Sequence, residues 1–236
     1  MQYLLSPLES HYDSDFGAVA NSFKYAADSL APAGIAQLSL NGHLPASFLY
    51  RHAIELYLKS GILIFHKKFN IPWGKESPNE EPGLVVNGKW HAMFNVHRLT
   101  PLHARLIEIV QLQANYLSAQ TRTNWSFPQE LQDWVATIDS ADSSSTFFRY
   151  PVTKHKDRDK EKSSVKEEPI KSILGSIGAG EAAQKVHVVL DAEGHVVESY
   201  RLDNAAGMAL LEVLRKVADC MYGCHAALRG ELTGGR

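Results

Sequence analysis

Five titratable side chains interrupt an otherwise apolar stretch, SFLYRHAIELYLKSGILIFH, at residues 47–66. They are Arg51, His52, Glu55, Lys59 and His66. On a helical wheel of about 100° per residue they fall within an arc of roughly 100°, so they form one polar stripe. The stripe could be the solvent-facing side of a helix, on which Glu55 and Lys59 pair at i,i+4. Alternatively, because Phe48 and Ile62 share the arc, it could be the partly apolar wall of a binding groove.

The sequence contains only weak signals for a metal site or for a catalytic nucleophile. Cys220, Cys224 and His225 lie close together and offer two ligands on one helical face, whereas a structural zinc site takes four. Buried, unreactive cysteines are the better interpretation. The glycine-rich segment Gly175–Gly180 lacks the Lys-Ser/Thr of a phosphate-binding loop, and the chain contains no Gly-x-Ser-x-Gly elbow. We therefore predict no metal site and no cofactor.

Elements with helical periodicity must position the polar stripe. Apolar residues at helical spacing predict a first helix from about Ser14 to Leu30 and a second that begins near Pro45. The second helix is apolar over so much of its surface that we expect it to touch more than one neighbour. A third helix is predicted from Thr100 as N-cap with Pro101 in its first turn. Its expected buried residues are Leu102, Leu106, Ile109, Tyr116 and Leu117.

Two further helices follow along the chain. The first comes after Pro128 and the second, capped by Asp203, closes the chain. Their expected buried stripes are Leu131, Trp134, Val135 and Ile138 in the first, and Ala206, Ala209, Leu210, Val213, Leu214, Val217 and Met221 in the second. Periodicity therefore predicts a bundle of five helices of medium or greater length.

Three segments interrupt the helices. Residues 67–99 contain prolines, glycines and aromatics and predict an irregular but ordered loop over the bundle. Residues 152–184 are highly charged and then glycine-rich, which is typical of a mobile insertion. Six Lys/Arg against three acids in Lys154–Lys166 could contact RNA phosphates, although a solvated loop is favoured. Residues 185–202 alternate apolar and polar around Glu193-Gly194 and predict a β-hairpin. The predicted fold is mainly α, an up-and-down bundle with a β-hairpin insertion before the last helix, forming a single domain over 1–236.

The composition limits the functional classes. Of the 236 residues 44% are hydrophobic, which is enough for a sizeable core, and the net charge of −2 does not fit a protein that coats nucleic acid. No signal peptide, no run of about 20 apolar residues and no cysteine framework is present, so we expect a cytoplasmic protein without a membrane span.

Three short motifs resemble one group of bacterial HEPN-like proteins. They are FLYRHAIELYLK at 48–59, a His-x-Leu-x-x-Leu pattern at His97–Leu102, and FRYP at 148–151. The resemblance covers under half of the chain and leaves the later insertion unmatched. It implies a small helical bundle and a place in a bacterial defence or toxin–antitoxin system. It also implies a homodimer and, as partners, an operon-encoded protein, RNA or a nucleotide.

HEPN ribonucleases carry an Arg followed four to six residues later by His. Here the match is Arg98 and His103. The resemblance implies metal-independent RNA cleavage, with His103 as general acid/base and Arg98 stabilising phosphate charge. The match departs from the pattern in three ways: Leu99 stands where a polar residue is usual, the motif lies at the start of a helix, and Arg98 takes the Asp or Asn position of the His-x-Leu-x-x-Leu pattern. The leading hypothesis is therefore a binding or regulatory subunit, with a dimeric endoribonuclease as the alternative.

The remaining candidate binding residues come from the same motifs. Arg149 and Tyr150 belong to FRYP, where fixing the turn before Pro151 is favoured over ligand binding. His97 opens the His-x-Leu-x-x-Leu pattern. Together with Arg51, His52, Glu55 and Lys59, these residues complete the predicted binding set.

Overall fold

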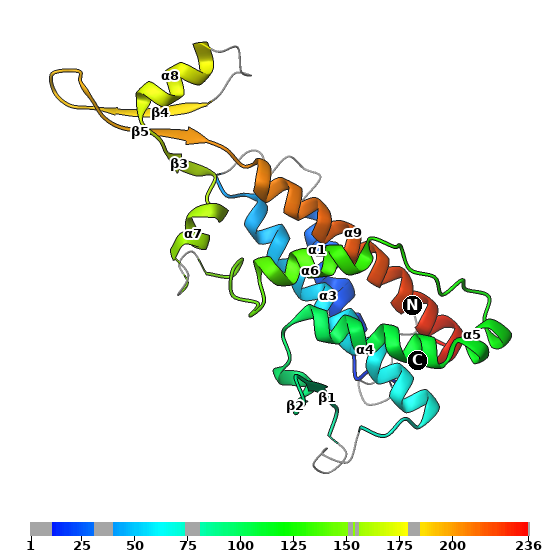
Figure 1. Cartoon of the computed structure of the whole chain (residues 1–236). Helices are drawn as coiled ribbons and strands as arrows, with labels where there is room; N and C mark the ends of the chain where they lie inside the picture. Colours follow the sequence, from blue (N-terminus) through cyan, green and yellow to red (C-terminus); the bar gives the residue numbers. More distant parts are fainter. Residues whose placement is uncertain are drawn as a thin grey trace.

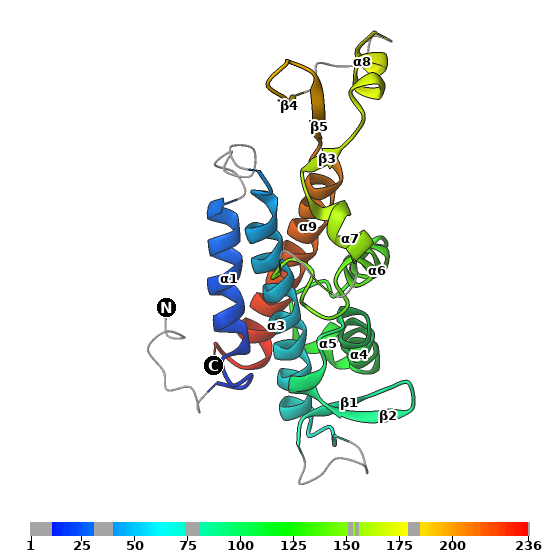
Figure 2. The ribbon, with the colours of Figure 1, turned by 90° about the vertical axis from the view of Figure 1, so that its left-hand side faces the viewer.

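The chain folds into a helical body from which a small β-sheet arm projects (Figures 1 and 2). The computed structural model describes residues 11–30, 40–73, 81–150, 153, 156–178 and 185–235. The helices of the body are α1 (Phe16–Leu30), α3 (His43–Phe69), α4 (Leu99–Leu112), α5 (Ala114–Gln120), α6 (Leu131–Ala141) and α9 (Ala205–Ala227). The chain is mainly helical and forms a bundle with small sheets, which confirms that part of the predicted fold class. None of the described helices is long and apolar enough to cross a membrane.

Helix α3 is the centre of the body. It packs against α1, α9 and α4 (Figure 2). Every residue from Ala53 to His66 is buried. A helix that is apolar over most of its circumference has to be covered on several sides, which explains its central position. Asn70 ends α3 in the left-handed conformation at φ 50°, and its N–H donates to the His66 carbonyl. The prediction of a central helix with several neighbours is confirmed.

Helix α4 begins two residues earlier than the sequence predicts, and its cap comes from another helix. Arg98 is the N-cap residue, with no side-chain cap of its own. Asp139 on α6 instead accepts hydrogen bonds from the Leu99 N–H at 2.8 Å and from the Thr100 hydroxyl at 2.8 Å. The prediction of Thr100 as N-cap is therefore wrong, because a carboxylate distant in sequence satisfies the first turn. Tyr116 on α5 is 39% exposed, so its predicted burial is also wrong.

The segment before α4 contains a β-hairpin that the sequence analysis missed. Strands β1 (Gly83–Val86) and β2 (Lys89–Ala92) pair antiparallel and lead into a 3-10 turn at Met93–Asn95. Asn87 and Gly88 both have positive φ, as a two-residue hairpin turn requires. The Asn-Gly pair was the available signal. Residues 74–80 of the predicted 67–99 loop lie outside the described residues.

The arm consists of three strands and a helix. The strands are β3 (Val165–Glu167), β4 (Val186–Leu190) and β5 (Val196–Leu202), in the order β3-β5-β4, and α8 (Ile170–Gly178) packs against β5. The predicted 185–202 hairpin corresponds to β4 and β5. The composition of 152–184 predicts a mobile insertion, and its described part forms α7 (Lys156–Lys162), β3 and α8. Residues 151–152, 154–155 and 179–184 lie outside the described residues.

Helix α9 continues directly from the arm into the body (Figure 1). Asn204 rather than Asp203 is its N-cap residue, although the Asp203 carboxylate accepts a hydrogen bond from the Ala205 N–H at 3.0 Å. Its buried residues are Leu211, Leu214, Val217, Ala218, Met221 and His225. The predicted stripe is therefore correct in the second half of the helix, while Ala206 and Ala209 are exposed and line a hollow.

Candidate functional site

The polar stripe of α3 converges on one carboxylate, Glu55. Its two oxygens accept hydrogen bonds from the Arg51 guanidinium at 2.9 Å and from the Lys59 ammonium at 2.8 Å. The His97 Nδ1 lies 3.1 Å from the same oxygen that Lys59 contacts. Arg51 also donates to the His97 carbonyl and, at 3.4 Å, to the Asp142 carbonyl. We call Arg51, Glu55, Lys59 and His97 the Glu55 cluster.

Three of the four residues of the Glu55 cluster are buried. Arg51 is 0%, Glu55 2% and Lys59 3% exposed. The interpretation of the stripe as a solvent-facing strip is therefore wrong for these residues, and also for His66, because neighbouring segments cover them. Burial alone would raise the pKa of Glu55, but the positive charges of Lys59 and Arg51 outweigh it and hold that pKa below its ordinary value.

The contacts of the cluster indicate what it can do chemically. Both Glu55 oxygens already accept hydrogen bonds. Arg51 donates to Glu55 and to the backbone carbonyls of His97 and Asp142. Only His97, whose side chain is 51% exposed, opens to solvent. A charge network so paired ties α3 to the segments around His97 and Asp142 and encloses the Glu55 carboxylate between two cations.

The two residues of the proposed catalytic pair have different surroundings. Arg98 forms an ion pair with Asp139 on α6 at 3.1 Å. His103 is 7% exposed and lines a hollow of about 280 Å³ with Trp125, Phe127 and other residues, among which Arg98 does not occur. Burial lowers the pKa of His103, and its Nε2 has no hydrogen-bond partner among the described residues. Burial therefore favours the neutral imidazole, and the hollow is lined by apolar residues together with Gln111, Gln129 and Gln132.

The other candidate binding residues lie in aromatic contacts. His52 is half-buried, edge-on to Phe23 with ring centroids 4.5 Å apart and stacked on Phe48 at 6.0 Å. Arg149 lies over the Phe48 ring at 5.4 Å, and Tyr150 is 48% exposed. Pro151 of the FRYP motif lies outside the described residues. These contacts position the 147–150 turn against the start of α3.

His66, the last member of the stripe, belongs to a separate group at the far end of α3. Its ring stacks on Trp73 at 3.6 Å, and its two nitrogens contact the Ile71 carbonyl at 2.9 Å and the Arg105 guanidinium at 3.2 Å. Burial lowers the pKa of His66 to about 4. Because Arg105 can only donate, His66 accepts from it as a neutral imidazole.

A serine, a histidine and an aspartate meet in the core, which sequence spacing could not indicate. The Ser60 hydroxyl donates to Asp13 Oδ2 at 2.6 Å, and His225 Nδ1 lies 3.0 Å from the same hydroxyl. In a hydrolytic triad the histidine stands between serine and carboxylate, whereas here the serine stands in the middle. All three are at most 3% exposed. The group joins the N-terminal segment to α3 and α9 and has the geometry of a structural link.

The two cysteines on α9 lack thiolate character. Burial, followed by the neighbouring Cys220, raises the pKa of Cys224 to about 12, and burial raises that of Cys220. Since the thiolate is both the nucleophile and the metal ligand, neither side chain is activated for that chemistry.

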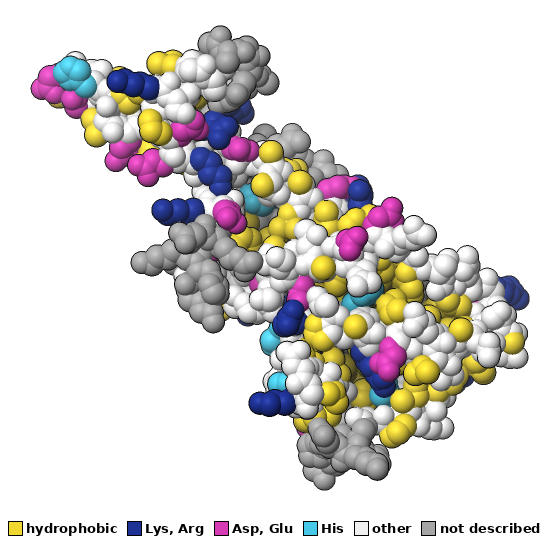
Figure 3. All heavy atoms as spheres, in the orientation of Figure 1, with side chains coloured by type: hydrophobic (Ala, Val, Ile, Leu, Met, Phe, Trp, Pro, Cys, Tyr) yellow, Lys and Arg dark blue, Asp and Glu magenta, His cyan; other side chains and the backbone are white. Residues whose placement is uncertain are grey.

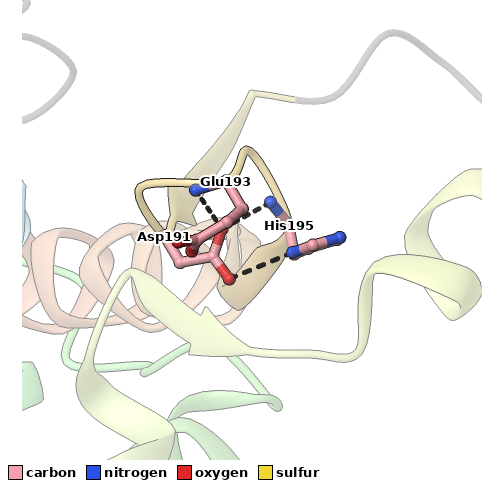
Figure 4. A group of neighbouring side chains, drawn as sticks. All are labelled: Asp191, Glu193 and His195. Carbon is pink, nitrogen blue, oxygen red and sulfur yellow. Dashed lines mark hydrogen bonds and ion pairs between the residues drawn. The ribbon is translucent and has the colours of Figure 1, made fainter.

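Three possible metal ligands gather at the turn between β4 and β5. Asp191, Glu193 and His195 have ligand atoms within 4.8 Å of one another, and all three residues are exposed (Figure 4). Asp191 already accepts hydrogen bonds from the N–H groups of Glu193 at 3.1 Å and His195 at 2.7 Å. That pattern is an Asx-type turn, so the carboxylate closes the hairpin.

A hollow of about 530 Å³ at the joint of body and arm was also missed from sequence. Most of its wall is apolar and includes Phe147, Phe148, Leu210 and Val213. His43, 2% exposed, lines it with an Nδ1 that has no partner among the described residues. The residue that could have drawn attention to this hollow in the sequence is His43, two residues before Pro45. A search for apolar periodicity does not take a histidine into account.

Comparison of the chain with protein-family models, with curated proteins and with solved structures found no match.

Proposed function

We propose that this protein is a binding or regulatory subunit that works through protein contacts rather than through RNA cleavage. The observation that carries the proposal is the projecting arm, whose outer strand β4 presents Val188, Val189 and Leu190 to solvent at 36%, 36% and 55% exposure. Exposed apolar side chains gathered on a strand at a sheet edge are typical of a surface that pairs with another chain. A place in a bacterial defence or toxin-type system, and a HEPN-like fold, rest on the motif resemblance alone.

The charges of the body favour protein over RNA or nucleotide. RNA binding draws on cations that are free to meet phosphates. Here Arg51 and Lys59 are buried on Glu55, Arg98 pairs with Asp139, and Arg105 pairs with Glu108. On the face shown in Figure 3, Lys and Arg side chains lie mixed with Asp and Glu, and hydrophobic side chains show on both body and arm. No large basic patch is present on that face.

The alternative function is a dimeric, metal-independent endoribonuclease using Arg98 and His103. One observation favours it: the buried His103 Nε2 has no hydrogen-bond partner among the described residues. The ion pair of Arg98 with Asp139 and the burial of His103, which is 7% exposed, count against it. A nuclease would have to release Arg98 and open the hollow before phosphate could reach both groups.

An RNA-cleavage assay in EDTA tests the proposal. Purified full-length protein and its His103→Ala and Arg98→Ala variants are incubated with end-labelled single-stranded RNA, and folding of each variant is checked by circular dichroism. We expect no cleavage by any of them. Cleavage by the wild type that both substitutions abolish would overturn the proposed function and establish the nuclease.

A further inference from the structure

We propose that the partner of the arm is a second copy of this chain, joined by antiparallel pairing of β4 with β4. This inference rests on the proposed function and names its protein partner. In the resulting assembly the two three-stranded arms form one continuous six-stranded sheet, with β4 of each copy at its centre. Three features of β4 favour this pairing: an open backbone edge, an apolar and uncharged strand, and charges at its ends that complement each other.

The backbone of β4 has an open edge. Among the described residues β4 pairs only with β5. The Leu202 N–H donates to the Lys185 carbonyl at 2.9 Å and the Asp191 N–H to the His195 carbonyl at 3.0 Å, so Lys185 and Asp191 direct their backbone groups toward β5. Backbone direction alternates along an antiparallel strand. The N–H and C=O groups of Val186, Val188 and Leu190 therefore point outward.

The strand lacks the devices that usually protect an edge. Natural edge strands carry a proline, a charged side chain in the strand or a bulge. The sequence of β4 is VHVVL, without proline, lysine or acid. The register shift in this sheet pairs Val189 with Glu198 and Leu190 with Val196, which makes Val197 on β5 the extra residue and leaves β4 regular. The open edge is thus continuous over the whole strand.

The ends of β4 make the strand complementary to itself. Lys185 precedes it and Asp191 follows it, and both are exposed. In an antiparallel pair centred on Val188, Val188 faces Val188 of the second copy and Val186 faces Leu190. The same register brings Lys185 of each copy opposite Asp191 of the other, which produces two symmetric pairs of opposite charge.

Other registers are less favourable. If the second copy were shifted by one residue along β4, its outward backbone groups would lie opposite groups that already bond to β5. The hydrogen-bond ladder between the two copies could then not form. A shift of two residues keeps the alternation but gives fewer hydrogen-bonded pairs and moves Lys185 away from Asp191 of the second copy. The register centred on Val188 therefore combines the longest ladder with matched charges.

The pairing also determines where the two α8 helices lie. A two-fold axis through Val188, perpendicular to the sheet, leaves the two α8 helices on the same face of the joined sheet. Leu174 on α8 is 60% exposed in the single chain. The joined sheet thus gathers the exposed apolar residues of two arms on one surface.

Sedimentation velocity on the full-length protein tests the pairing. We expect a dimer at twice the chain mass of 26.2 kDa. Val188→Pro removes the outward N–H of both copies and spares the hydrogen bonds to β5. Loss of two backbone hydrogen bonds should weaken the dimer by about 30-fold. The matched control is Val188→Thr, which keeps both the N–H and β-branching and should remain dimeric. Lys185→Glu should weaken it roughly 2- to 10-fold, more at low salt.

A crosslinking experiment keeps the test decisive if the proline variant damages the arm. Directly opposed, hydrogen-bonded residues lie about 5.5 Å apart between Cα atoms, within the range of a disulfide. Oxidised Val188→Cys should therefore form a covalent dimer. Val197→Cys, at a position 61% exposed on β5, and the wild type should not.

The outcomes separate the two proposals. A monomeric wild type, or a dimer that neither weakens in Val188→Pro nor crosslinks in Val188→Cys, would overturn the β4 pairing. That result would leave the proposed non-catalytic role standing. Cleavage of RNA that depends on His103 would overturn the role and say nothing against the pairing.

Discussion

Replacing Glu55 with glutamine should destabilise the protein far more than the same change at an exposed ion pair. Glu55 is 2% exposed and accepts from Arg51 at 2.9 Å and Lys59 at 2.8 Å, with His97 Nδ1 at 3.1 Å. In Glu55→Gln the two cations stay buried without their counter-charge. Breaking a buried pair from one side costs about 3–5 kcal/mol of unfolding free energy. For a chain of this size that lowers Tm by roughly 6–20 °C.

Glu212→Gln is the matched control. Glu212 contacts Arg215 at 2.8 Å, but the two side chains are 46% and 50% exposed. An exposed pair contributes at most about 1 kcal/mol, so this Tm should fall by no more than about 4 °C. Thermal unfolding followed by circular dichroism measures both variants. Equal, small shifts in the two would refute the argument that the Glu55 cluster stabilises the fold.

The pH dependence provides a second check on the same site. The pKa of Glu55 lies below its ordinary value of 4.5 because Lys59 and Arg51 outweigh the effect of burial. Its contribution to stability is therefore full above pH 4.5 and is lost as the pH falls through the lower pKa of the folded state. The Tm difference between wild type and Glu55→Gln should narrow in acid. A difference that stays constant down to the acid transition would contradict the assigned charge.

The remaining predictions concern close packing and buried histidines. A Cβ on Gly17 would lie 2.0 Å from His225 Cε1, so Gly17→Ala should lower the unfolding free energy by about 1–3 kcal/mol. Gly223→Ala, on the exposed side of α9 with open space around it, should raise it by about 0.5–1 kcal/mol in urea titrations; the reverse order would contradict the packing. Burial lowers the pKa values of His66 and His225 to about 4 from 6.5, so the unfolded chain binds more protons between these values. Unfolding free energy should therefore fall as the pH is lowered from 6.5 to 4, and His225→Asn should reduce that slope.

Local patterns predicted the helices well and their boundaries less well. The apolar periodicity of α3, α6 and the second half of α9 follows from residues three and four apart on one helix, which the sequence contains directly. The boundary of α4 did not follow, because Asp139, about 40 residues away, caps it. The β1–β2 hairpin was missed although Asn87-Gly88 signalled it, since the surrounding prolines favoured a loop.

At the candidate site, too, the sequence predicted which residues share a helix face but not what surrounds them. The sequence predicted that Arg51, Glu55 and Lys59 share one face of a helix, and they do form one connected cluster. It could not predict the surroundings of Arg98 and His103, since Arg98 forms an ion pair with Asp139 on α6 while His103 lines a hollow with Trp125 and Phe127. Spacing along a chain fixes neither the direction of a side chain nor what covers it.

The sequence by itself determined a mainly helical chain, a central helix and a polar stripe on that helix, because these depend on periods of a few residues. Only the tertiary structure decided that the stripe is buried. Arg51 donates to carbonyls 46 and 91 residues away, at His97 and Asp142, and these segments exclude water from Glu55. The physical reason is that helical periodicity is a local property of the chain, whereas burial and charge compensation depend on segments that only the fold brings together.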